Sequence, residues 1–363
     1  MPTDIELVFC GDTMLGARPL ERNPFESLKS HLQAADLGFC NLETALAEGA
    51  CLSEKRHVID TPAQNLEFLT HTGFGIVHLA NNHVFDRGQA AFDSLVNHLT
   101  KDGIEISGLA EAGRAKPVLI TRQGVTFGFL GYGDYGFKQD LMPLRPRVAL
   151  ADVAALSARV DCVVVSLHWG FEYAELPSPE QQRLARNLID AGAAMVIGHH
   201  PHVVQGIEEY HKGLIAYSLG NFQFRIGLGD VFLSRGTGIM LKVRRSAQGE
   251  LRHCAFPIKL SDADEVQVCS GAEAERGLAQ VAKLSAAVNR KRIHRLAWLR
   301  EASRLWFPSQ LESWCFRARR FGTIQWVRML AWLLQPSNLF LLLCYLLGPK
   351  HASSRSLFHK AQS

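Results

Sequence analysis

Seven short apolar runs recur along residues 1–245, and segments with helical spacing lie between several of them. The runs are rich in β-branched and aromatic residues, and most end in polar residues, as buried strands do. Strands that alternate with helices indicate an α/β domain over residues 1–245. The predicted strands span residues 6–11, 36–43, 74–83, 125–133, 161–170, 193–200 and 214–221.

Three intervening segments have the apolar periodicity of amphipathic helices: residues 23–36, 61–73 and 178–192. They open with Asn-Pro, Thr-Pro and Ser-Pro, and the last two end at glycine. Proline is favoured in the first turn of a helix and glycine just past its end. We therefore expect helices in these three segments.

Chemically versatile side chains follow the predicted strands. In open α/β sheets, ligands bind at the edge where the strands have their carboxyl ends. Side chains from five separate segments are therefore expected to converge on one site. They are Asp12, Glu43, Asn82, His83, His168, His200 and His202.

Six of these residues form a mixed nitrogen and oxygen ligand set: Asp12, Glu43, Asn82, His168, His200 and His202. Imidazole prefers borderline metals, so the set suits Mn, Fe, Zn or Ni better than Ca or Mg alone. In an extended segment His200 and His202 point to the same side, and Pro201 stiffens the pair. Six ligands exceed what one tetrahedral zinc takes, and two ions about 3.5–4 Å apart would accommodate them.

The same residues also have ordinary structural interpretations. A single histidine at a strand end is more often a hydrogen-bonded structural residue than a ligand, and Asp12 alone could cap a turn. Their shared placement at one edge favours the metal site. His83, next to Asn82, could then donate a proton to a leaving group, and Asp86 could orient its imidazole. This is hydrolytic chemistry without an organic cofactor, and the sequence contains no P-loop, no GxGxxG after a strand and no GxSxG.

Six short motifs occur in a characteristic order. They are GDTMLG (11–16), NLET (41–44), LANNHVFDRG (79–88), HWGFEY (168–173), GHHPHVVQG (198–206) and YSLGNFQF (217–224). In this order and spacing they resemble the CapA family, the poly-γ-glutamate capsule synthesis proteins related to calcineurin-like metallophosphatases. The resemblance covers residues 5–245.

The resemblance implies a metallophosphatase-like four-layer sandwich, in which two β-sheets are flanked by helices. It assigns Asp12 and His202 to one metal and Asn82, His168 and His200 to the second, with Glu43 as the bridge. It makes His83 the proton donor. By position in the motifs, Glu172, Asn221 and His199 are expected to shape the site or contact substrate.

One departure from the superfamily concerns the first metal. Many metallophosphatases begin with Asp-x-His, whereas this chain has Asp12-Thr13-Met14. Methionine is a poor ligand for a hard or borderline ion. One or two divalent ions, with Mn, Fe or Zn favoured, are therefore expected.

The resemblance also implies a function. The expected activity is metal-dependent phosphoester hydrolysis on a phosphorylated or polymer substrate, linked to capsule or poly-γ-glutamate biosynthesis. The alternative is a non-catalytic, metal-binding assembly component of the capsule or polyglutamate synthesis machinery.

The charge is distributed unevenly along the chain. Residues 1–275 contain 24 Lys and Arg against 33 Asp and Glu, whereas residues 276–330 contain 12 against 2. Such asymmetry indicates different partners for the two parts. We divide the chain into a CapA-type domain at 1–260 and a basic, partly hydrophobic helical C-terminal extension at 261–363.

The extension has two segments that suggest membrane association. Residues 289–307 combine arginines with tryptophans at helical spacing, which is typical of a helix at an anionic membrane surface. Residues 329–348 are strongly apolar but are interrupted at Gln335-Pro336-Ser337-Asn338. A helix that packs on the core is the alternative, and a nucleic-acid partner is disfavoured because of the interleaved aromatic residues.

Location follows from the same features. The first residues lack a signal-peptide pattern, and the eight cysteines show no regular spacing. We therefore expect a cytoplasmic protein that is peripheral to the inner membrane or anchored there by its C-terminus.

Overall fold

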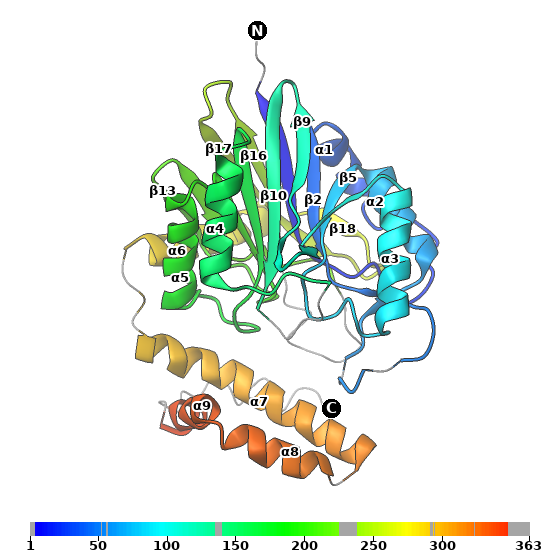
Figure 1. Cartoon of the computed structure of the whole chain (residues 1–363), viewed down its shortest axis with the longest axis vertical. Coiled ribbons are helices and arrows are strands. Elements are labelled where there is room, and N and C mark those ends of the chain that lie inside the picture. Colours follow the sequence, from blue (N-terminus) through cyan, green and yellow to red (C-terminus); the bar gives the residue numbers. More distant parts are fainter. Residues whose placement is uncertain are drawn as a thin grey trace.

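The computed structural model describes residues 4–51, 53–55, 57–134, 140–224, 238–290, 293, 295–322 and 324–347. Two β-sheets pack face to face, and helices cover the outer face of each (Figure 1). The larger sheet has eight strands in the order β18-β17-β16-β1-β2-β5-β6, with β15 also paired to β1. Its strands are β1 (Ile5–Thr13), β2 (Leu37–Leu42), β5 (Phe74–His78), β6 (Glu105–Ser107), β15 (Asn221–Gln223), β16 (Gly238–Arg245), β17 (Leu251–Leu260) and β18 (Val266–Val268).

The second sheet has six strands in the order β13-β14-β12-β11-β10-β9. They are β9 (Val118–Arg122), β10 (Val125–Gly133), β11 (Cys162–His168), β12 (Met195–His199), β13 (Ile207–Tyr210) and β14 (Gly213–Ala216). Two small pairs complete the strands: β3 (Ala45–Leu46) with β4 (Asp60–Thr61), and β7 (Ala110–Glu111) with β8 (Arg114–Ala115).

The helices form three groups. The first sheet is covered by η1 (Glu26–Leu28), α1 (Lys29–Gln33), η2 (Ala63–Leu66), α2 (Glu67–Thr72) and α3 (Gln89–Lys101). The second sheet is covered by α4 (Pro146–Ser157) and α5 (Pro179–Asp190). The C-terminal helices are α6 (Gly271–Arg290), α7 (Arg295–Phe321), α8 (Ile324–Leu333) and α9 (Pro336–Leu347).

Alternation along the strands explains the layers. In β1, Ile5, Leu7 and Phe9 face the second sheet, whereas Val8 and Cys10 lie in the cluster under the helices. Successive side chains of a strand point to opposite faces, so a strand that is apolar on both sides needs a cover on each. The predicted four-layer α/β sandwich is confirmed.

Each predicted strand and helix has a counterpart, most of them shorter than predicted, although β1 extends beyond 6–11 and β10 coincides with 125–133. The 178–192 prediction corresponds to α5, where the Ser178 hydroxyl accepts the Gln181 N–H and Gln181 reciprocates in a capping box. The 61–73 prediction corresponds to η2 and α2, which end at Gly73 with φ of 111°. In 23–36 only η1 and the short α1 form.

The larger sheet continues past the predicted boundary at residue 260, because β18 pairs with β17. Helix α6 then packs against β13 and β17. Helices α7, α8 and α9 form a separate layer next to the edge where β1, β11 and β12 have their carboxyl ends (Figure 1). The C-terminal helices therefore lie on the side of the molecule where the sequence places the site.

The expectation that 289–307 is a helix at a membrane surface is corrected in one respect. Most of this segment is helical in α6 and α7, and its residues 291, 292 and 294 lie outside the described ones. However, Trp298 packs on Phe171, its indole N–H donates to Leu176 O at 2.8 Å, and Trp306 stacks on the same phenylalanine. These two tryptophans therefore pack against the α/β body, so they are not the side chains that would enter a membrane surface.

No single helix among the described residues is both long and apolar enough to cross a bilayer. One pair, Ile324–Leu333 with Asn338–Leu346, meets the length and composition together, but its two arms meet at 80°.

Candidate metal centre

The ends of both sheets supply the centre. Asp12 lies at the end of β1, Glu43 directly follows β2, and His168 ends β11. Asn82 and His83 come from the turn after β5, and His200 and His202 from the turn after β12. The structure thus brings together all six predicted ligands, because parallel neighbouring strands end at the same edge.

Two sets of donor atoms share Glu43. Ligand atoms of Glu43, His168 and His200 lie within 4.8 Å of one another, and so do those of Asp12, Glu43 and His202. All five residues are buried. Asn82 belongs with the first set, since its side-chain oxygen lies 2.9 Å from His168 Nε2. The arrangement matches a pair of cation positions joined by one carboxylate.

Glu43 Oε1 lies at the middle of this cluster. The Nε2 atoms of His83, His168 and His202 each lie 3.9 Å from it. That separation is too long for a hydrogen bond, and this buried oxygen has no hydrogen-bond partner among the described residues. Ligands that bind one ion at about 2.0–2.2 Å lie within about 4.4 Å of one another. The residues therefore fit divalent metal ions.

The backbone at the two ligand histidines is unusual. His200 and His202 have φ of 95° and 57°, a region that residues with a Cβ seldom adopt. The His200 N–H also points at Asp12, 3.3 Å from Oδ2. Such strain is retained where the surrounding structure requires it, and it clusters at functional sites.

The electrostatics of the cluster favour a cation. Burial raises the pKa of Glu43, and the nearby charge of Asp12 raises it further. Burial also acts on Asp12, but the hydrogen bond and charge of His202 outweigh it and lower the pKa of Asp12. Burial opposes protonation of His202, yet Glu43 and Asp12 raise its pKa to about 10. The two carboxylates that stabilise an imidazolium here would equally stabilise a bound metal ion.

His168 and His200 are suited to act as neutral ligands. Burial lowers the pKa of both imidazoles well below its usual range, and neighbouring histidines contribute. Their rings lie 4.7 Å apart. A neutral imidazole is the form that binds a metal.

His83 is held by Asp86 beside this cluster. His83 Nδ1 lies 2.6 Å from Asp86 Oδ2, and the His83 N–H donates to the Asn81 side-chain oxygen at 3.1 Å. Burial, followed by the charge of Lys55, lowers the pKa of His83 to about 4, although Asp86 opposes this. The ring thus presents Nε2 to the cluster while Nδ1 is engaged.

Three expected substrate-contact residues occupy different positions. Asn221 is buried, and its side-chain oxygen lies 2.9 Å from His202 Nδ1. Glu172 is half-buried, and burial raises its pKa against the charges of His202 and Lys55. His199 has no exposed surface, and its ring stacks on those of Phe39 and His78. In this position it supports the site from behind, which agrees with a role in shaping the site.

Other residues at the site follow from the structure and not from the sequence reasoning. Asn41 donates to Asp12 Oδ1 at 2.8 Å and lies 3.4 Å from Glu43 Oε2. Its two-residue spacing from Glu43 on a strand was the available signal, since such residues share a face. Met14, at the position of the missing histidine, packs with Ile59 and Phe224.

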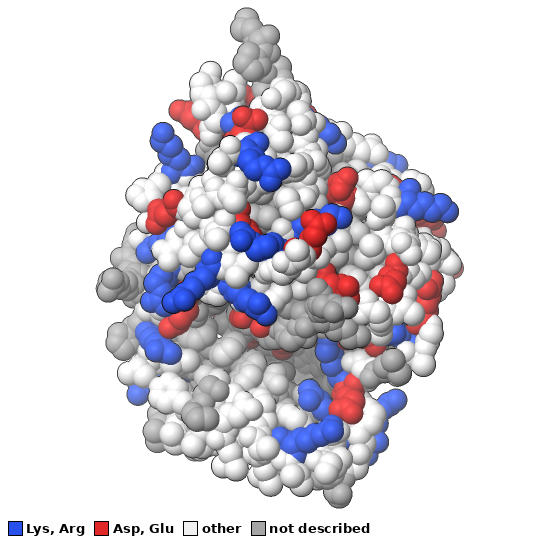
Figure 2. Space-filling model, viewed as in Figure 1, with Lys and Arg blue, Asp and Glu red and all other residues white. Residues whose placement is uncertain are grey.

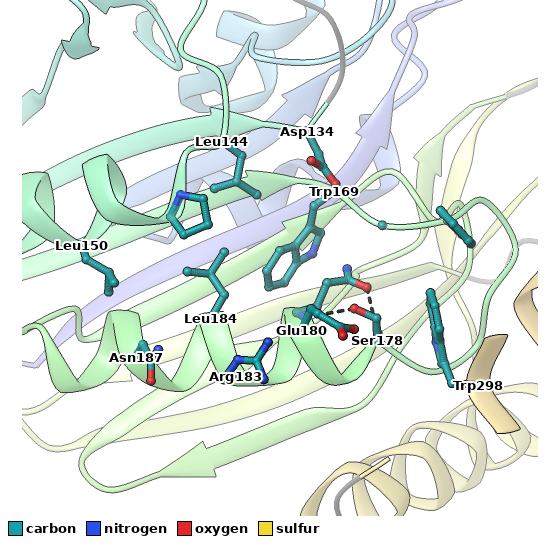
Figure 3. Close-up of a pocket in the computed structure, with 14 residues that line it drawn as sticks. Asp134, Leu144, Leu150, Trp169, Ser178, Glu180, Arg183, Leu184, Asn187 and Trp298 are labelled. Carbon is teal, nitrogen blue, oxygen red and sulfur yellow. Dashed lines mark hydrogen bonds between the residues drawn. The ribbon is translucent and has the colours of Figure 1, made fainter. Parts of the chain in front are cut away.

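A separate cavity of about 430 Å³ opens beside the loop that follows β11 (Figure 3). Leu144, Leu150 and Leu184 line it between α4 and α5, and Trp298 of α7 lies at its far end. It contains none of the predicted metal ligands. The cavity therefore marks the junction between the body and α7, whereas the metal centre is the buried polar cluster.

Comparison with known proteins decides the family. The profile of the family described as "Bacterial capsule synthesis protein PGA_cap" matches residues 6–225. The chain belongs to this family. The resemblance carried by the six motifs is thereby confirmed.

Two relatives and one solved structure illustrate the similarity. The chain is 30% identical to the PGA biosynthesis protein CapA of Bacillus subtilis over 60% of this chain and 63% of the relative. It is also 30% identical to a Mycobacterium tuberculosis protein named "Probable polyglutamine synthesis accessory protein", over 60% of this chain and 64% of that one. The chain thus spans less than two thirds of these relatives. A phosphatase structure from Mycoplasma pneumoniae is similar over 71% of this chain and 94% of its own, with a TM-score of 0.49 and 14% identity.

Proposed function

We propose that this member of the capsule synthesis family is a metal-dependent hydrolase that cleaves a phosphoester or related bond. The observation that carries the proposal is the position of Glu43 Oε1, with three imidazole Nε2 atoms at 3.9 Å. A buried carboxylate oxygen among imidazoles is costly unless a cation joins them. Catalysis gives a reason to retain such a cluster.

The residues have distinct roles in this proposal. Asp12 and His202 would hold one ion, Asn82, His168 and His200 the other, and Glu43 both. Divalent ions held in these positions would supply Lewis-acid chemistry, which neutralises phosphate charge and lowers the pKa of water. The imidazolium form of His83 would donate a proton from Nε2 to the leaving group, while Asp86 holds Nδ1 and fixes the orientation of the ring. Burial keeps the pKa of His83 low, so the negative charge of a bound substrate is what would favour this form.

The substrate and its setting follow from the family. We propose a phosphorylated or polymer substrate in capsule or poly-γ-glutamate synthesis, with the machinery of that synthesis as partner. The names of the family and of its Bacillus subtilis relative support this setting. Glu172 and Asn221 would shape the substrate side of the site.

We further propose that α8 and α9 bind an anionic membrane surface at the cytoplasmic face of the inner membrane. Val327, Leu330 and Leu334 are 61%, 55% and 72% exposed, and Leu343 and Leu346 of α9 are also exposed. Much of the end of the molecule formed by the C-terminal helices is white in Figure 2, with basic and acidic side chains gathered at one side. Arg319 and Arg320 of α7 are exposed. Exposed apolar patches rimmed by basic residues suit anionic lipid. All eight cysteines are free, which fits a reducing compartment.

A non-catalytic role is the second candidate, and it is favoured by the name of the Mycobacterium tuberculosis relative, which describes an accessory protein. One experiment separates the two. Elemental analysis of the purified full chain is combined with a panel of aryl phosphates and γ-glutamyl anilides. We expect one or two bound transition-metal ions and hydrolysis of an aryl phosphate that a chelator abolishes. Bound metal without any hydrolysis would support the assembly role, and a chain that binds no transition metal would contradict both.

A further inference from the structure

The segment between β3 and β4 lies against the turn that carries His83. Within it, Cys51 Sγ lies 3.9 Å from Asp86 O, and the Ile59 N–H donates to Asp86 Oδ2 at 3.1 Å. Arg87 Nε contacts Asp60 Oδ2 at 2.6 Å. Contacts from Cys51, Ile59 and Asp60 therefore hold this part of the chain against the turn that carries His83.

Lys55 makes the most direct of these contacts. Its Nζ donates to Asp86 Oδ1 at 2.8 Å and also to the backbone oxygen of Asn82. It therefore binds the turn on both sides of His83. His83 and Ile59 share the other Asp86 oxygen, so Lys55 restrains rotation of the carboxylate that orients the imidazole.

The neighbouring residue connects this segment to the C-terminal helices. Glu54 Oε2 accepts from Gln325 Nε2 at 3.3 Å and lies 3.6 Å from Arg328 Nη1. Both partners belong to α8 and lie three positions apart, so they face the same way on the helix. Gln325 is 2% exposed, whereas the side chains of Glu54 and Arg328 are 50% and 58% exposed, so the contact joins a buried amide to the rim of the interface.

We propose that Lys55 is a positioning residue for the His83–Asp86 pair, and that α8 places Lys55 through Glu54. The inference rests on the proposed hydrolase function and extends it: the C-terminal helices form part of the catalytic unit. Lys55 acts through Asp86, which holds His83 Nδ1. Loss of Lys55 frees the carboxylate and the imidazole together, without removing a predicted metal ligand.

Lys55 could instead contact an anionic substrate, since its side chain is 37% exposed. The two roles differ in kinetics. A substrate contact raises KM, whereas a positioning residue lowers kcat and leaves KM near the wild-type value. The arginine variant separates them further, because a guanidinium can still bind Asp86.

The test uses full-length Lys55→Met, Lys55→Arg and Arg328→Ala with an aryl phosphate. We expect kcat of Lys55→Met to fall by about 10- to 100-fold, with bound metal and KM unchanged, as for other groups that support a catalytic residue. Lys55→Arg should recover most of the loss, and Arg328→Ala should lower kcat by about 2- to 30-fold. The matched control is Lys29→Met, since Lys29 is 39% exposed and faces Glu26. Wild-type kcat in Lys55→Met, or a rise in KM alone, would overturn the inference.

A second readout does not depend on turnover. Hydrogen exchange at the Ile59 amide reports whether its bond to Asp86 stays formed. Exchange should become faster in Lys55→Met and Arg328→Ala and stay unchanged in Glu48→Ala, an exposed residue of the same segment. Unchanged exchange in the first two variants would overturn the coupling to α8. An inactive wild-type chain would instead count against the proposed hydrolase, while this measurement would still decide the coupling.

Discussion

The α/β body and helices α8 and α9 depart from ordinary burial in opposite ways. The body buries a cluster of carboxylates and imidazoles at the ends of its strands. Helices α8 and α9 expose a series of large apolar side chains. Buried polar groups and exposed apolar patches are the informative exceptions in a protein, because each requires a partner. In the proposal made above, the partners are cations for the body and an apolar surface for the helices.

The largest expected effect concerns the buried cluster of carboxylates and imidazoles. Glu43→Gln removes the carboxylate that both donor sets share, so we expect loss of bound metal. Turnover should fall by more than the roughly 10- to 100-fold that loss of an outer-shell partner costs. The metal-free variant should nevertheless melt at a higher temperature than the metal-free wild type, since burial and Asp12 disfavour the Glu43 charge. Elemental analysis and calorimetry check this, and retained metal with full turnover would contradict it.

The second prediction compares packing in the two regions with matched substitutions. Phe127 is fully buried between the sheets, whereas Phe171 lies between Trp298 and Trp306 of α7. Phe127→Ala should lower the free energy of unfolding by about 3–5 kcal/mol. Phe171→Ala should cost about 1–2 kcal/mol, confined to faster hydrogen exchange in α7–α9. If both variants lowered the unfolding midpoint of the α/β body equally, the two regions would unfold as one unit, and the prediction would be wrong.

The smallest expected effect concerns the exposed apolar side chains of the C-terminal helices. Leu330→Asp combined with Leu334→Asp should lower binding to phosphatidylglycerol vesicles by about tenfold or more. Leu119→Asp is the matched control, because Leu119 is 48% exposed but belongs to β9 of the body. Co-sedimentation with vesicles measures the partition. Equal binding of the double variant and the wild type would contradict a membrane role for α8 and α9.

The sequence predicted the chemistry of the body better than the placement of its supports. Asp12, His168 and His200 could be grouped because parallel strands end at one edge. The facing of the two sheets followed from the family resemblance, since periodicity alone does not show which sheets pack together. Lys55 could not be found, because it lies in an irregular segment and reaches Asp86 by a long-range contact.

The C-terminal helices show a different limit. An amphipathic pattern shows that a helix has an apolar face but not whether lipid or protein covers it. Trp298 and Trp306 meet Phe171 of the body, whereas Leu330 and Leu334 stay exposed. His199 illustrates the same limit in the body: sequence places it next to His200, but alternation along β12 turns it into the interior.

The most direct test of the hydrolase proposal is His83→Ala, assayed for bound metal and aryl phosphate turnover in the same preparation. His83 faces Glu43 Oε1 but is not among the predicted ligands. We expect unchanged metal content and a loss of turnover of about 10²- to 10⁴-fold, the usual contribution of a general acid. The exposed His211→Ala should behave as the wild type. Wild-type turnover in His83→Ala would contradict the assignment of this histidine as the proton donor.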